Sequence, residues 1–211
     1  MFQPPIFSVD DKELMHELML THPFGTLISI QDGGITADHL PLVIHPELSE
    51  QGTIRAHIAK GNPLWLKRKT SMEILAIFQG PQAYITPSWY PSKKQHGKVV
   101  PTWNYAVIHA HGELNFRTDE EWLLDHLVEL SNRQEDGRYK AWKVSDAPDS
   151  YIAKQLKGIV GIEIEIKKLE GQWKVSQNKN EEDRTGVQEG LKLEADQVAN
   201  SMSELVREFG K

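Results

Sequence analysis

Apolar and polar residues alternate along much of the chain, which is the pattern of half-buried β-strands. Residues 24–30 (FGTLISI) and 159–169 (IVGIEIEIKKL) show this alternation most clearly. A helical period replaces it at residues 9–20, where Ser8 and Asp11 have the spacing of a capping box. The pattern therefore predicts a chain that opens with an amphipathic helix and continues mainly as strands.

Further strands and helices follow from the same period and from turn signals. Trp173–Ser176 is expected to pair with the strand at 159–169 across a turn at Glu170-Gly171. The other predicted strands are residues 35–44, 53–59, 71–79, 82–86 and 101–116. The other predicted helices are residues 62–68, 119–135, a short helix from Pro148, 180–189 and 194–208.

Six or seven short strands with helices at the periphery predict a small closed or sandwiched β core, an α+β fold that is mainly β. The predicted strands and helices do not alternate, so the pattern does not indicate a parallel sheet. No repeat or low-complexity linker divides the chain, so a single domain over residues 1–211 is expected, with a C-terminal helical segment at about 180–209.

The amino-acid composition is that of a globular protein. Hydrophobic residues make up 39% of the chain and charged residues 26%, an ordinary globular balance. The absence of cysteine excludes disulfides and thiolate chemistry and fits a reducing cytosol. The beginning of the sequence lacks the pattern of a signal peptide, and no apolar run approaches the ~20 residues of a membrane span. A cytoplasmic protein with no membrane association is expected.

The formal charge of −6 disfavours binding of nucleic acid, because such binding depends on contacts from Lys and Arg to phosphate. The side chains best suited to bind a ligand are concentrated in residues 84–112, where Trp89, Tyr90, Trp103 and Tyr105 are interleaved with basic residues. This mixture suits a flat conjugated ligand that carries phosphate, and it equally suits nucleic-acid bases. The alternative is an aromatic core cluster beneath a solvated basic loop.

A second concentration of polar residues is Arg55-Ala56-His57-Ile58-Ala59-Lys60-Gly61-Asn62. Arg55 and His57 share one face of a strand, and Lys60 and Asn62 follow at the strand end, before a helix start that favours an anion. A phosphate cradle is one interpretation, and ordinary surface charges are the other. The run from Lys174 to Asn180 offers a similar set, or simply a helix cap.

His109 and His111 lie two residues apart on a predicted strand, so both rings face one side and could chelate a metal. A typical site needs a third ligand, and the sequence places none of His39, His57 and His96 nearby. Polar partners in a core or a cofactor pocket are therefore preferred, and no metal is expected. The sequence contains neither a GxSxG elbow nor a GxGxxG loop.

Long motifs in the chain resemble the PaiB family, described as FMN-binding negative transcriptional regulators. The central motif is TPSWYPSKKQHGKVVPTWNYAVIHAHG, and ADHLPL, RAHIAKGNPLW and KVSQNKNEEDRTGVQEGL accompany it in order. The resemblance covers most of the chain, from about Phe2 to Leu191. It implies the FMN-binding split β-barrel with peripheral helices, and a bacterial homodimer with FMN in a groove at the subunit interface.

The resemblance also implies roles for particular residues. The phosphate of FMN would be contacted by Arg55, His57, Lys60 and Asn62. The site would be closed by Lys174, Ser176, Gln177 and Asn178. The ring system would be lined by Gln79, Trp103, Asn104 and Tyr105.

Three functions remain open at this point. One is a flavin-binding regulator without turnover, for which direct DNA contact is not supported by the charge and no helix-turn-helix is evident. The second is a flavin-dependent oxidoreductase that acts on a small molecule, with its catalytic residues unassigned. The third is a heme-binding relative of the split barrel, with His96, His109 or His111 as axial ligand.

Overall fold

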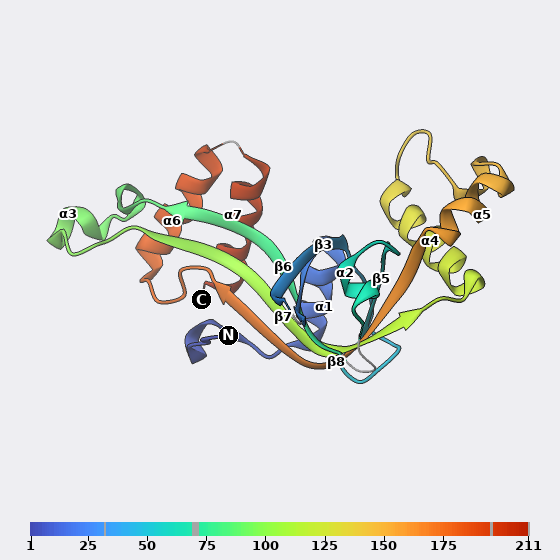
Figure 1. Ribbon diagram of the computed structural model, residues 1–211. Helices are drawn as coiled ribbons and strands as arrows, with labels where there is room; N and C mark the ends of the chain where they lie inside the picture. The colour runs from blue at the N-terminus through green and yellow to red at the C-terminus, as the bar shows by residue number, and fades with distance from the viewer. Residues whose placement is uncertain (32, 69–71, 195, 211) are drawn as a thin grey trace. The chain divides into compact units, whose positions relative to one another are not determined.

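The computed structural model describes residues 1–31, 33–68, 72–194 and 196–210, and these residues form an antiparallel β-sheet with flanking helices (Figure 1). The strands are β1 (Ser8–Val9), β2 (Phe24–Gln31), β3 (Gly34–Pro41), β4 (Val43–His45), β5 (Thr53–Ala59), β6 (Met72–Ile85), β7 (Thr102–Arg117) and β8 (Ile159–Lys174). The α-helices are α1 (Lys12–Thr21), α2 (Pro63–Leu66), α3 (Ser92–His96), α4 (Glu120–Glu135), α5 (Asp149–Lys157), α6 (Glu181–Leu193) and α7 (Gln197–Phe209). Short 3₁₀ turns are η1 (Pro5–Phe7), η2 (Pro87–Trp89) and η3 (Val144–Asp146).

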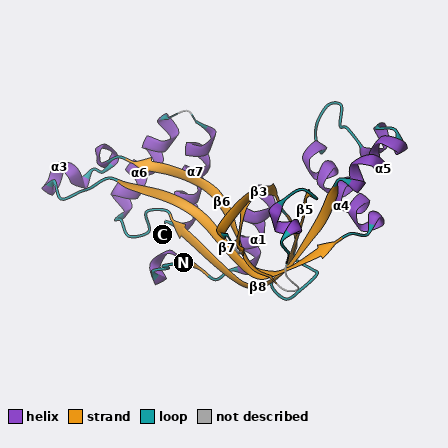
Figure 2. Cartoon of the chain, in the orientation of Figure 1, coloured by secondary structure: helices purple, strands orange, loops and turns teal. Residues whose placement is uncertain are grey.

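The strand order of the sheet is β3-β2-β6-β7-β8-β5-β4, and β1 pairs with β8 beside this path. The long strands β6, β7 and β8 stand out among the strands drawn in Figure 2. Alternate residues of β7 are buried from Asn104 to Leu114, as expected for a strand with one covered face. The fold is therefore α+β and mainly β, as the sequence predicted.

The chain forms two compact units, and the strands β6, β7 and β8 all run through both of them. Unit 1 consists of residues 1–18, 78–109 and 170–211, and unit 2 of residues 19–77 and 110–169. The expectation of a single domain stays a prediction, and each unit is described by itself below.

In unit 2 the strands β4, β5 and the first part of β8 contribute buried apolar side chains to the hydrophobic core. Ile54 and Ile58 of β5 and Ile162 of β8 are almost completely buried, because every second residue faces the same side. On the opposite face α4 packs against β5, and Trp122 lies over Gly161 so closely that a Cβ there would come within 2.2 Å of the indole. This contact holds α4 on β8, directly beside β5, which carries Arg55 and His57.

In unit 1 the helices α6 and α7 pack against each other, as Figure 1 shows. Val187 and Leu191 of α6 and Met202 and Val206 of α7 are fully or almost fully buried, at the spacing of one helical face. Helices α6 and α7 occupy the residues where the sequence predicts the helices 180–189 and 194–208. Ala195, within the predicted helix 194–208, lies outside the described residues, as does Ser71 at the start of the predicted strand 71–79.

The predicted hairpin at Glu170-Gly171 is wrong, because β8 continues through both residues. Gly171 pairs with Val9 of β1, and a Cβ at this position would come within 2.8 Å of the Met15 sulfur. Gly80 likewise lies inside the continuous strand β6, where the sequence predicted a break. Both glycines allow close packing within unit 1 and do not form turns.

The predicted helix starts are correct to within a few residues, but the capping residue of α1 differs from the predicted one. Asp11 accepts a hydrogen bond from the backbone of Leu14 and so acts at the start of α1, where the sequence suggested Ser8. Asp119 in the same way accepts from the backbone of Trp122 at 2.8 Å. A carboxylate at the helix start is a strong cap, since it satisfies a backbone N–H and interacts favourably with the helix dipole.

Candidate functional site

The side chains of Arg55 and His57 share the half-buried face of β5, while Ile54 and Ala56 point into the core of unit 2. This arrangement follows directly from strand alternation and agrees with the sequence prediction. The register places Arg55 opposite Glu163 of β8. The first candidate site is therefore built on this face, where β5 and β8 run side by side.

Glu163 is bound by two arginines. Arg55 Nε donates to one carboxylate oxygen at 2.9 Å, and Arg117 Nε donates to the other at 3.1 Å, with a further contact from the Arg117 guanidinium. Burial alone would raise the pKa of Glu163, but the hydrogen bonds and charges of Arg117 and Arg55 outweigh it and lower the pKa. Glu163 is therefore ionised at neutral pH and holds both guanidinium groups at one place.

A surface groove of about 460 Å³ opens at this place. It is lined by Leu48, Ser49, Thr53, Arg55, Asn115, Arg117, Glu163 and Glu165. Glu165 is paired with Lys167 at 2.6 Å, so its charge is balanced locally. Two arginines against the one remaining carboxylate leave a positive charge in the groove, which suits an anion that accepts hydrogen bonds from guanidinium groups. We refer to this site as the arginine groove.

His57 faces a buried histidine of α4. Its Nδ1 lies 3.2 Å from His126 Nε2, and the His126 ring stacks on Trp122 with an interplanar angle of 20°. Burial lowers the pKa of His57; burial, with the charges of His57 and Arg55 adding to it, lowers the pKa of His126 to about 3. Both rings are therefore neutral at pH 7, and one donates to the other.

Lys60 and Asn62 lie just beyond β5, as predicted. Asn62 caps α2 by accepting from the backbone of Leu64 at 2.8 Å, and its amide donates to Asp38 at 2.7 Å. The Asp38 carboxylate places negative charge beside this helix start and opposes an anion there. The role of Lys60 and Asn62 in phosphate binding stays a prediction.

Three of the predicted ring-lining residues lie on β7, on its two faces. Trp103 and Tyr105 occupy the more exposed face, whereas Asn104 points the other way and is completely buried. The Asn104 amide donates to the hydroxyl of Ser176 at 2.9 Å, inside the unit. Asn104 and Ser176 therefore hold the end of β7 to the segment after β8, through a bond between two buried side chains.

The remaining predicted residues of unit 1 have local partners or are exposed. Lys174 donates to the carbonyl of Trp103 at 2.9 Å and to the hydroxyl of Thr102, and burial together with Lys179 lowers its pKa. Gln177 folds back onto the backbone of its own turn by accepting from Val175 N. Gln79 and Asn178 are exposed. Contacts of these residues with a flavin stay predictions.

The histidines considered for metal or heme have local partners of their own. A ring nitrogen of His109 lies within 4.8 Å of a carboxylate oxygen of Glu170, which the sequence analysis did not consider as a ligand. That carboxylate also binds the N-terminal amine at 3.0 Å. His39 Nδ1 lies 3.1 Å from the Thr26 hydroxyl, and the backbone of Lys98 donates to His96.

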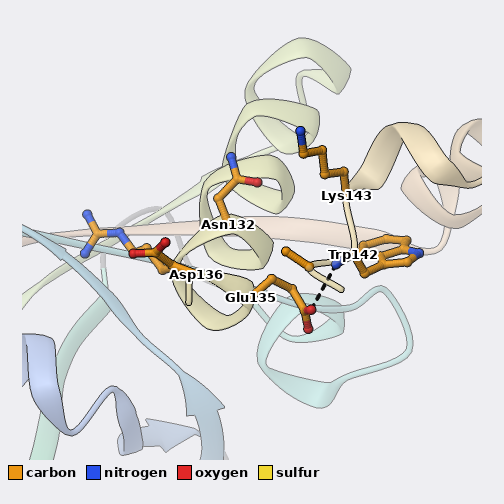
Figure 3. A pocket seen from close by; sticks show the side chains of 7 residues that line it. Asn132, Glu135, Asp136, Trp142 and Lys143 are labelled. Atoms are coloured by element: carbon orange, nitrogen blue, oxygen red, sulfur yellow. Dashed lines mark hydrogen bonds between the residues drawn. The ribbon is translucent and has the colours of Figure 1, made fainter. Parts of the chain in front are cut away.

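A cavity of about 490 Å³ lies at the C-terminal end of α4 (Figure 3). Glu135 accepts from the backbone N–H of Trp142 at 3.0 Å, which closes the loop that follows the helix. In Figure 3 the side chains of Asp136 and Lys143 point in different directions, and the polar groups do not converge on one point. This cavity is therefore explained by loop closure.

Sequence reasoning missed Arg117, Glu163 and His126 as members of the site. Arg117 ends β7, Glu163 lies on β8 and His126 lies on α4, so only strand register and helix packing bring them to Arg55 and His57. A usable signal was present in the strand 159–169, where the alternation places Glu163 and Glu165 together on the polar face.

Known structures share this fold. The FAD- and heme-binding protein of Mycobacterium smegmatis aligns over 79% of this chain and 73% of its own, with a TM-score of 0.57 and 13% identity. The flavocytochrome Anf3 of Azotobacter vinelandii aligns over 85% and 75%, with a TM-score of 0.57 and 11% identity. The fold is therefore the split barrel of flavin-binding proteins.

The sequence comparisons identify the family. Residues 1–168 match the family model described as "Putative FMN-binding domain". The protein PAI 2 of Bacillus subtilis, named for protease synthase and sporulation, is 32% identical over 99% of this chain and 97% of its own length. An uncharacterized protein of Emericella nidulans is 34% identical over 94% and 93%. The chain belongs to the PaiB family of FMN-binding-domain proteins.

Proposed function

We propose that this protein binds FMN and that the arginine groove of unit 2 holds the FMN phosphate. The observation that carries the proposal is the convergence of Arg55 and Arg117 on the single carboxylate of Glu163. Guanidinium groups match phosphate oxygens in geometry and in charge. Bound FMN supplies one- and two-electron redox chemistry, and the protein residues bind and orient it.

The charge of the groove fits a phosphate. Glu163 satisfies only part of the donor capacity of two guanidinium groups, since each has five N–H donors. Asn115 offers a further polar group at the lining, and the Thr53 hydroxyl donates to Ser49 at 3.2 Å. A phosphate in this groove would share the arginines with Glu163 and would gain charge-assisted hydrogen bonds from both.

The test is the replacement Arg55→Gln, with FMN and riboflavin titrated in parallel. The two flavins differ only in the phosphate, so their affinity ratio isolates its contribution. Loss of one charge-assisted contact should weaken FMN binding about tenfold to a hundredfold and leave riboflavin binding nearly unchanged. Flavin fluorescence quenching measures both affinities.

The matched control is Arg133→Gln, which removes an arginine of unit 2 that pairs with Glu129 on α4 and does not line the groove. Its FMN affinity should equal that of the unaltered protein. Thermal unfolding of each variant shows whether the fold persists. Equal FMN affinity in the Arg55→Gln variant and the control would remove the groove from the phosphate site.

The proposal includes a cytoplasmic homodimer with the flavin bound at the subunit boundary, as the family resemblance implies. Binding at such a boundary would couple dimerisation to FMN, so that each stabilises the other. His57, Lys60 and Asn62 are proposed as further contacts to the phosphate, and Tyr105 as a contact to the ring system.

We further propose that the bound flavin serves a regulatory role, as the resemblance to the PaiB family implies. A flavin-dependent oxidoreductase is the competing function. Bleaching of the bound flavin by NAD(P)H, with turnover of electrons to an acceptor, would identify the enzyme. Retardation of DNA by the purified protein without such turnover would identify the regulator.

A further inference from the structure

Unit 1 contains a cavity of about 440 Å³ that neither FMN binding nor the family description explains. The segments that line it come from β6, η2, β7, the end of α6 and the start of α7. The residues that decide its chemistry are Tyr84, Trp89, Trp103, Leu191, Glu194 and Asp196. We refer to it as the aromatic cavity.

Two aromatic rings of neighbouring strands form one wall. Tyr84 of β6 and Trp103 of β7 meet edge to face, with ring centroids 6.0 Å apart and an interplanar angle of 68°. Despite this contact Tyr84 is 48% and Trp103 54% exposed. Two neighbouring aromatic rings this open to solvent form a contiguous exposed surface of the kind that marks a binding site.

A third ring is held in place by glycines of α6. A Cβ at Gly190 would come within 2.3 Å of the Trp89 indole, and one at Gly186 would come within 2.0 Å of the Trp89 carbonyl oxygen. Any side chain at either position would displace η2 from α6. Trp89 is therefore fixed before a ligand arrives, which lowers the entropic cost of binding.

The aromatic cavity is acidic. Glu194 is the C-cap residue that follows α6, and Asp196 caps α7 by accepting from the backbone of Ala199 at 3.3 Å. Among the residues that the structure describes, neither carboxylate has an ion-pair partner, and no Lys or Arg lines the cavity. Two uncompensated negative charges beside aromatic faces attract a cation and repel a phosphate.

We propose that the aromatic cavity binds a small organic ammonium ion. The ring faces of Tyr84 and Trp103 attract the positive charge, and Glu194 and Asp196 neutralise it. Leu191, a buried apolar side chain, also lines the cavity. The site differs in charge from the arginine groove, so an anion such as FMN phosphate would not compete for it.

The experiment uses choline as the probe and 3,3-dimethylbutan-1-ol as its neutral isostere, since the two have nearly the same shape. Each is titrated into the full-length protein at constant ionic strength, and tryptophan fluorescence is followed. Choline should give a saturable change, with an affinity at least about fivefold higher than that of the neutral alcohol. Equal affinities would overturn the proposal.

Two matched variants locate the site. Glu194→Gln removes a lining charge and should weaken choline binding at least about threefold, whereas Glu189→Gln removes an exposed charge of the same helix and should leave it unchanged. Trp103→Leu should abolish the binding, with isothermal calorimetry replacing fluorescence as the readout. Equal choline affinity in the Glu194→Gln and Glu189→Gln variants would overturn the assignment. FMN retention, measured alongside, should be unaffected by Glu194→Gln.

Discussion

At the scale of single residues, the least expected feature is the pair of neutral histidines between β5 and α4. His57 was predicted from the sequence as a phosphate contact, and its ring nitrogen lies 3.2 Å from His126. A protonated ring here would lose its solvation and face Arg55, which also lies over the Trp122 ring at 5.4 Å. The pair is therefore stable only while both imidazoles are neutral.

This pair makes the stability depend on pH. The folded pKa of His126 is about 3, below the ordinary value of 6.5, so protons bind the unfolded chain more readily. The contribution of neutral His126 to the free energy of unfolding is complete above about pH 6.5. It should fall by about 1.4 kcal/mol for each pH unit between pH 6.5 and pH 3. Denaturant unfolding at several pH values measures the slope.

The matched variant is His126→Phe, which keeps an aromatic ring beside Trp122 and removes the titrating group. Its unfolding free energy should decline less steeply between pH 6.5 and 5 than that of the unaltered protein. Parallel curves for the two proteins would show that the histidine pair does not govern the acid sensitivity.

At the scale of elements, helices were predicted well because their signals are local. The carboxylate before α4 and the spacing of apolar residues within it are enough to predict this helix without any information on the rest of the chain. Glycines inside strands misled the prediction, since Gly171 was interpreted as a turn residue. Its actual role is to let Met15 approach the sheet, and a period or a turn preference cannot reveal such a contact.

The sequence also predicted only the local part of the candidate site. The face shared by Arg55 and His57 follows from strand alternation, and the structure agrees. Their partners Glu163 and His126 come from far along the chain and depend on the register of β5 with β8 and on the packing of α4. Local patterns carry no information on these long-range contacts.

The packing of α4 on the sheet can be tested at Gly161. In the variant Gly161→Ala the new Cβ would meet Trp122 at 2.2 Å and Arg117 at 3.0 Å, so helix or strand must shift. Overpacking of this kind costs about 1–3 kcal/mol. A chain of this length should then melt several degrees lower, about 2–4 °C for each kcal/mol.

Gly61→Ala is the matched control, since a Cβ at this position meets no atom within 4 Å. Its melting temperature should stay within about one degree of the original value. If Gly161→Ala melted no lower than Gly61→Ala, the close contact of Trp122 with the sheet would be incorrect.

At the scale of the whole molecule, the fold and the family agree with each other. The antiparallel sheet matches split-barrel structures at low identity, and the family model covers residues 1–168. Among the described residues, no helix has the length and apolar character that crossing a bilayer requires. The net charge of −6 contrasts with the local positive charge of the arginine groove, which concentrates the attraction for an anion at one site.

Co-elution of FMN with the protein would show directly whether the chain binds this cofactor. The purified protein is mixed with FMN and passed through gel filtration, with flavin absorbance and light-scattering mass recorded across the peak. We expect stoichiometric flavin absorbance in a peak with the mass of a dimer, and little flavin when riboflavin replaces FMN. A protein peak free of flavin after loading with excess FMN would contradict it.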